Sequence, residues 1–131
     1  LINNKGLTDL LINTDDKWEK FIQNIDFIDN LSAITSGNKK IDIIKLYKSN
    51  KMKNLINKIN NSDLYDLIIW DCSSIYDFSE SRILASYLDG IILQISLDGV
   101  KKDIAKYCYE LIKYRRLNFL GILVSSNKNF P

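Results

Sequence analysis

The chain has 131 residues, of which 46% are hydrophobic and 26% are charged, so it is long enough for one core and too short to argue for two. Its net charge of +2 is too small to indicate a nucleic-acid partner, and the absence of histidine argues against zinc sites and against Ser-His or Cys-His catalysis. We expect residues 1–131 to form a single domain that belongs to a longer protein, since the first residue is Leu1.

Helical patterns and short apolar runs alternate along the chain. In chain order they predict a helix at 15–23, a strand at 31–35, a helix at 49–60, a strand at 67–71, a helix at 79–88, a strand at 90–96, a helix at 100–115 and a strand at 119–125. The runs are apolar at nearly every position, which is typical of strands buried on both faces of a parallel sheet. The sequence therefore predicts an α/β fold in three layers, with a mainly parallel sheet between flanking helices.

Side chains within these elements refine the prediction. Ser49 is a candidate N-cap for the second helix, and Trp18 and Phe21 share one face of the first.

Cys72 and Cys108 fall at a strand end and in an amphipathic helix, where a free cysteine is usually buried. Free cysteines fit a reducing cytoplasm, so we expect a cytoplasmic protein. No apolar run approaches the ~20 residues of a membrane-spanning helix, so any link to the membrane is expected to come through a partner.

The apolar run at 67–71 ends in Asp71, the strongest candidate functional residue. Ligands of open α/β sheets collect beyond the carboxyl ends of the strands, and Mg²⁺ often takes one or two carboxylates together with phosphate oxygens and water. Asp71 is therefore a candidate Walker B residue, and the alternative is that it only caps the turn that follows. The chain contains no Gly-x-x-x-x-Gly-Lys-Ser/Thr loop to cradle the phosphates.

Other polar residues have simpler interpretations. Lysines gather at 39–53 and along the last helix, but acidic residues interrupt both groups, as on an ordinary solvated helix face. Tyr107, Tyr109 and Tyr114 suit half-buried packing positions better than phosphate acceptors. The serines near Asp71 have no basic neighbour in sequence that would activate a nucleophile.

Five segments, in order, resemble those of the bacterial tyrosine kinases of capsule and exopolysaccharide synthesis, relatives of the MinD and ParA type of P-loop ATPase. They are residues 4–11, 30–37, 49–52 and 88–93, together with 120–123, and the strand that ends at Asp71 lies among them. The resemblance implies ATP and Mg²⁺ as cofactors, with Asp71 as the Walker B carboxylate that holds Mg²⁺ through water. It also implies that the Walker A and A′ segments lie before Leu1, so we expect this chain alone to be inactive.

The chain departs from the family's pattern at three places. Asp71 is followed by Cys72-Ser73-Ser74 instead of Thr-Pro-Pro, and Ser125 stands where the family has the asparagine that reads adenine, with Asn127 nearby. The proline of the family's helix start is lost, but Asp42 keeps an N-cap there. Ser125 and Asn127 are therefore weaker candidates for the adenine side of the site.

The resemblance also implies partners. The family works with a membrane-bound polysaccharide chain-length regulator, which would bring a cytoplasmic domain to the membrane. Because a central strand of the family's sheet would lie before Leu1, we expect the isolated chain to form a homo-oligomer or to rearrange its sheet. Two alternatives are a non-catalytic module that docks on the regulator and a ParA-like partition ATPase that binds DNA through its lysines without sequence specificity.

Overall fold

The computed structural model describes residues 1, 5–13, 17–37 and 42–126. The chain divides into two compact units, residues 1–68 and residues 69–131.

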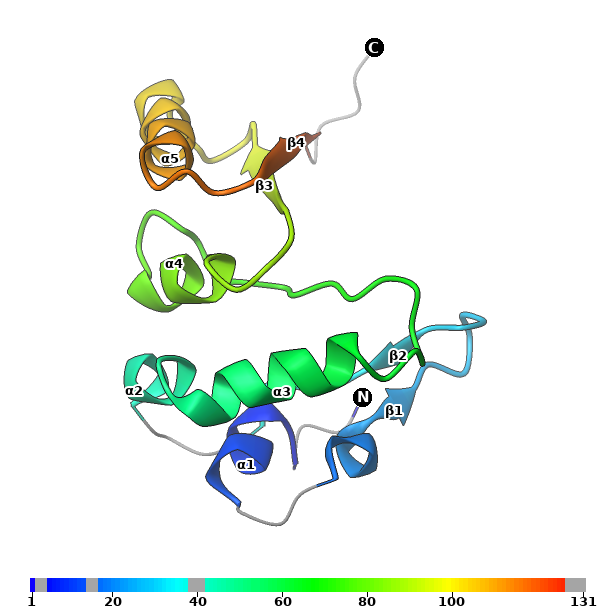
Figure 1. The fold of residues 1–131 in the computed structure, drawn as a ribbon. Coiled ribbons are helices and arrows are strands. Elements are labelled where there is room, and N and C mark those ends of the chain that lie inside the picture. The colour runs from blue at the N-terminus through cyan, green and yellow to red at the C-terminus, as the bar shows by residue number, and fades with distance from the viewer. Residues whose placement is uncertain (2–4, 14–16, 38–41, 127–131) are drawn as a thin grey trace. The chain divides into compact units, whose positions relative to one another are not determined.

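The first unit is mainly helical. Its elements, labelled in Figure 1, are α1 (Leu7–Ile12), the 3₁₀ helix η1 (Trp18–Phe21), β1 (Gln23–Asn24), β2 (Ser32–Ala33), α2 (Ile43–Tyr47) and α3 (Asn50–Asn60). Ser49 caps α3 as predicted, because its hydroxyl accepts a hydrogen bond from the Met52 amide at 3.3 Å. Asp42 caps α2 through the Lys45 amide at 3.1 Å, which confirms the N-cap expected there.

The core of this unit is built from apolar side chains of α1, η1 and α3. They are Leu10, Leu11, Trp18, Phe21, Met52, Leu55, Ile56 and Ile59. The four residues from α3 recur at helical spacing and form a single buried stripe, as the sequence predicted. Lys51 of α3 donates to the carbonyl oxygen of Ile12 at 3.1 Å, which ties α3 to the end of α1.

The start of α1 is packed against the backbone of residues 35–37. The amides of Leu7 and Thr8 donate to the carbonyl oxygens of Thr35 and Ser36 at 2.8 and 3.0 Å. Gly37 has φ +86°, a conformation that favours glycine. The chain therefore needs a residue without Cβ at this crossing.

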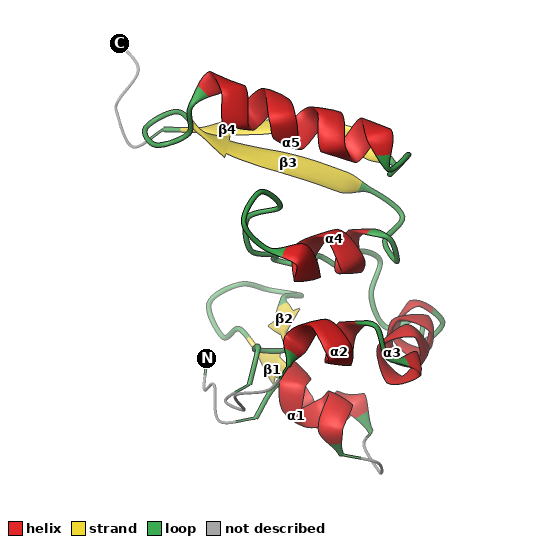
Figure 2. Cartoon of the chain, turned by 90° about the vertical axis from the view of Figure 1, so that its left-hand side faces the viewer, coloured by secondary structure: helices red, strands yellow, loops and turns green. Residues whose placement is uncertain are grey.

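The second unit is an α/β arrangement. It contains α4 (Ser79–Ala85), β3 (Ile91–Ser96), α5 (Lys102–Tyr114) and β4 (Phe119–Ser125). β3 and β4 are parallel, and Leu93 lies opposite Ile122. Figure 2 shows α5 alongside both strands, where Tyr109 makes an edge-to-face contact with Phe119. This βαβ unit and the α/β class agree with the sequence prediction.

Three predicted elements are wrong. Residues 67–71 form no strand, because a strand needs a hydrogen-bonded neighbour and the described part of the chain supplies none. Leu67 and Ile69 are accordingly 74% and 79% exposed. The strand expected at 31–35 is only β2, and it pairs antiparallel with β1. In the described part of 15–23, the predicted helix is replaced by η1 and β1.

The two strands of the second unit leave much apolar surface uncovered. Ile92 and Leu120 are 63% and 64% exposed, and three further apolar residues of β4 are at least half exposed, namely Ile122, Leu123 and Val124. Parallel sheets are normally covered on both faces and contain more than two strands. The β3–β4 pair is therefore suited to further partners. Within the described residues, no helix is long and apolar enough to span a bilayer.

Candidate functional site

Asp71 lies at the start of an exposed loop instead of at the end of a sheet strand. Its carboxylate is exposed and accepts no hydrogen bond from the described part of the chain. The simpler interpretation, in which Asp71 caps the following turn, therefore has no supporting contact. The Asp71 side chain is left available for a ligand from outside the unit, although no sheet edge positions it.

The loop after Asp71 is held by two side chains of α4. The Ser81 hydroxyl donates to the carbonyl oxygen of Ser73 at 2.8 Å. The Arg82 guanidinium donates from Nε to the carbonyl oxygen of Ile75 at 2.9 Å and from Nη2 to that of Tyr76 at 2.7 Å. These hydrogen bonds restrain a loop that contains no proline to stiffen it.

Ser74 closes the same loop from within. Its hydroxyl accepts from the Tyr76 amide at 3.2 Å, and its carbonyl oxygen accepts from the Phe78 amide at 3.1 Å. The Tyr76 ring then meets Tyr107 of α5 edge to face, with the ring centroids 5.7 Å apart. Sequence reasoning missed Ser81 and Arg82, since each bonds a carbonyl six to eight residues earlier and no local motif marks such a contact.

Electrostatics around the two thiols differ. Partial burial raises the pKa of the Cys72 thiol, and the neighbouring Asp71 carboxylate raises it further. Cys108 is buried in α5, and burial is the main cause that raises its pKa, with Asp77 adding to the effect and Arg82 opposing it. The expectation of a buried cysteine is therefore confirmed for Cys108 and wrong for Cys72, which is exposed.

Ser125 lies at the carboxyl end of β4, at the predicted edge of the sheet. Its carbonyl oxygen accepts from the Leu97 amide at 2.9 Å, and the next hydroxyl, that of Ser126, donates to Asp98 at 3.2 Å. Asn127 lies outside the described residues. Within the described residues, no hydrogen bond joins Asp71 to Ser125.

These residues fit a nucleotide and Mg²⁺ only in part. A single unengaged carboxylate suits Mg²⁺, which accepts few protein ligands. Among the described residues, however, no group of three or more acidic or cysteine side chains could hold a metal ion by itself. The sequence also lacks a glycine-rich phosphate loop. The described residues could therefore contribute at most a ligand for Mg²⁺ to such a site, and no phosphate-binding loop.

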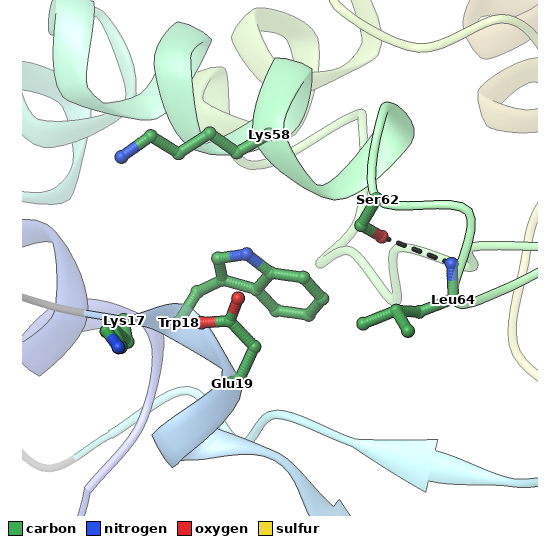
Figure 3. A pocket seen from close by; sticks show the side chains of 6 residues that line it. All are labelled: Lys17, Trp18, Glu19, Lys58, Ser62 and Leu64. Atoms are coloured by element: carbon green, nitrogen blue, oxygen red, sulfur yellow. Dashed lines mark hydrogen bonds between the residues drawn. The ribbon is translucent and has the colours of Figure 1, made fainter.

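The first unit carries a surface pocket of about 480 Å³ that contains none of the predicted residues. Figure 3 shows the side chains around it, which come from the start of η1 and from the end of α3 and the segment after it: Lys17, Trp18, Glu19, Lys58, Ser62 and Leu64. The Leu64 amide donates to the Ser62 hydroxyl at 3.4 Å, and Trp18 is only 5% exposed. The mixed charges of this lining select no particular ligand.

Comparison with known proteins identifies the fold. No family model and no curated protein matches the chain. The solved structure of the VpsO kinase domain matches 96% of the chain with a TM-score of 0.85 and 21% sequence identity, and the chimerical protein CapA2B2 matches 98% with a TM-score of 0.86 and 23% identity. The chain spans only 60% and 54% of those two proteins. It therefore has the fold of part of a kinase domain, which confirms the predicted α/β class.

Proposed function

We propose that this chain is part of an ATP-dependent protein-tyrosine kinase domain that acts in capsular or exopolysaccharide synthesis. The observation that carries the proposal is the likeness in fold to the VpsO kinase domain over 96% of the chain. The five segments between residues 4 and 123 that resemble this family support it independently, because a resemblance in sequence does not depend on the fold.

Within such a domain, Asp71 is the residue that we assign to Mg²⁺. Its carboxylate is exposed and unengaged, and Ser81 and Arg82 restrain the loop that follows it. Bound Mg²⁺ would offset the negative charge of the ATP phosphates. Ser125, and with it Asn127, would lie on the adenine side. Phosphate binding has to come from other parts of the kinase, so the isolated chain is inactive in this proposal.

The proposal includes the family's partners. The domain acts in the cytoplasm and reaches the membrane through a membrane-bound chain-length regulator, and copies of it associate with one another. A second candidate function is a non-catalytic module that docks on the regulator. The exposed apolar surface of β3 and β4 favours this alternative, because a docking module needs such a surface and does not need Asp71.

The proposal is tested on the complete product of the gene that encodes these residues. We expect it to phosphorylate itself on tyrosine with Mg²⁺ and ATP, and the Asp71→Asn variant to lose most of this activity. The matched control is Asp66→Asn, another exposed carboxylate nearby, which should keep full activity. Equal activity of the Asp71→Asn variant would refute the assignment of Asp71.

Calorimetric titration separates the two candidate functions. We expect no heat from Mg²⁺ and ATP with residues 1–131 alone, and binding with the complete protein. If the complete protein binds the cytoplasmic part of the regulator but binds no ATP, the kinase proposal is wrong and the docking module is correct.

A further inference from the structure

The surface pocket of the first unit contains a buried hydrogen-bond donor without a partner. Trp18, at the start of η1, is 5% exposed and lines this pocket of about 480 Å³. Its indole N–H donates no hydrogen bond to the described part of the chain. Figure 3 shows the ring edge that carries the indole nitrogen on the side of Lys58. Buried indole N–H groups usually have a partner, because an unmade hydrogen bond leaves the desolvation cost of the donor uncompensated.

The neighbouring Ser62 is already engaged. Its hydroxyl donates to the carbonyl oxygen of Ile59 at 2.7 Å and accepts from the Leu64 amide at 3.4 Å. The hydroxyl proton is therefore not available to a ligand. The Leu64 side chain is 59% exposed and gives this part of the pocket an apolar wall.

Three charged side chains surround the indole, and none is paired within the described residues. Lys17, Glu19 and Lys58 are exposed, and none of the three forms a hydrogen bond or an ion pair with the described part of the chain. Two ammonium groups and one carboxylate give the lining a net charge of +1. The lysines and the indole are donors only, so a ligand beside them has to present acceptor oxygens.

The charges of the lining alone select no ligand, but their combination with the buried donor does. A singly charged carboxylate neutralises the lining, whereas a doubly charged phosphate would leave a net negative charge beside Glu19. An ionised Glu19 only accepts hydrogen bonds, so the part of the ligand beside it carries hydroxyl groups. The volume of the pocket lies within the range of about 300–1,000 Å³ that is typical of small-molecule sites.

We propose that this pocket binds a sugar acid, that is, a hydroxylated carboxylate of the size of a hexuronic acid. Its carboxylate accepts from the Trp18 indole and pairs with Lys58, its hydroxyls donate to Glu19, and the C–H face of its ring packs on Leu64. An acidic peptide fits less well, because aspartate and glutamate side chains carry no hydroxyl for Glu19. The site contains none of the residues around Asp71, and the inference does not depend on kinase activity.

Proton–nitrogen NMR of residues 1–131 detects the proposed hydrogen bond directly. The chain has two tryptophans, so two indole N–H signals are expected, and Trp70→Phe assigns them. Titration with glucuronate should shift the Trp18 signal saturably, with a Kd on the order of 1 mM, and leave the Trp70 signal in place. Glucose, which lacks the carboxylate, and glucose phosphate, which is a dianion at pH 7, should bind at least ~10-fold more weakly.

Exposed variants test the charged groups without disturbing the core. Lys58→Gln should weaken glucuronate binding at least ~10-fold, because it removes the charged donor to the carboxylate. The matched control is Lys20→Gln, a lysine of η1 that does not line the pocket, which should bind like the wild type. Glu19→Gln removes the negative charge and should abolish the discrimination against glucose phosphate. All three side chains are exposed, so circular dichroism should show unchanged folding.

Four results would overturn the proposal: no saturable shift of the Trp18 signal with glucuronate, equal binding of glucose, equal losses in the Lys20→Gln and Lys58→Gln variants, or binding of a glutamate peptide in place of glucuronate. None of these results concerns ATP, so failure here is distinct from failure of the kinase proposal.

Discussion

Replacing Gly37 by alanine should destabilise the first unit. Gly37 has φ +86°, and a Cβ at this position would lie 2.6 Å from Asp9 Oδ2 and closer still to the hydroxyl oxygen of Thr8. Asp9 is 7% exposed, and its Oδ2 accepts a hydrogen bond from the Gly6 amide at 3.0 Å. The added methyl group would therefore strain the backbone at residue 37 and displace the Asp9 side chain from its hydrogen bond with the Gly6 amide.

The size of the effect follows from three contributions. The left-handed conformation costs alanine about 1–2 kcal/mol relative to glycine. Displacing Asp9 from the Gly6 amide leaves buried polar groups without their partner, at about 1–3 kcal/mol. The lower entropy of the unfolded alanine chain returns about 0.4–1 kcal/mol. We expect a net loss of about 3 kcal/mol from the free energy of unfolding, a large part of the stability of a small unit.

Urea denaturation followed by tryptophan fluorescence measures this loss. Trp18 is buried in the first unit and Trp70 belongs to the second, so a Trp70→Phe background makes the emission specific to the first unit. The control is Gly99→Ala, where a Cβ meets no atom within 4 Å and the stability should stay equal or rise slightly. A Gly37→Ala variant within about 0.5 kcal/mol of the parent protein would refute the reasoning.

Three further predictions use the same chain. Thr8→Val should leave the free energy of unfolding unchanged or raise it by up to about 1 kcal/mol in urea denaturation, because the buried Thr8 hydroxyl has no hydrogen-bond partner among the described residues. A clear loss of stability would show that this hydroxyl is hydrogen-bonded. Met52→Ala should cost about 2–5 kcal/mol in the same assay, because Met52 is 0% exposed, and a loss below 1 kcal/mol would contradict its place in the core. At pH 8, Asp71→Asn should speed alkylation of Cys72 by iodoacetamide about two-fold, because removing the carboxylate lowers the raised pKa of this thiol and increases the thiolate fraction. The alkylation rate of buried Cys108 is the control. An unchanged Cys72 rate would contradict the electrostatic coupling between Asp71 and Cys72.

The Asp71 site was predictable only in part. Sequence reasoning identified Asp71 by its place after an apolar run, and the structure leaves the carboxylate available. It could not identify Ser81 and Arg82 as the residues that hold the loop, because their hydrogen bonds depend on how α4 folds back on residues 73–76. The positive φ of Gly37 could likewise not be predicted, since it depends on packing against α1.

The sequence by itself determined the elements whose signals are local. The buried stripe of α3, the caps at Ser49 and Asp42, and the β3–α5–β4 unit follow from helical spacing, from short polar side chains at helix starts and from uninterrupted apolar runs. Only the tertiary structure decided that residues 67–71 form no strand. An apolar run becomes a strand when a neighbour supplies its hydrogen bonds, and that neighbour is a property of the assembled sheet, not of the run itself.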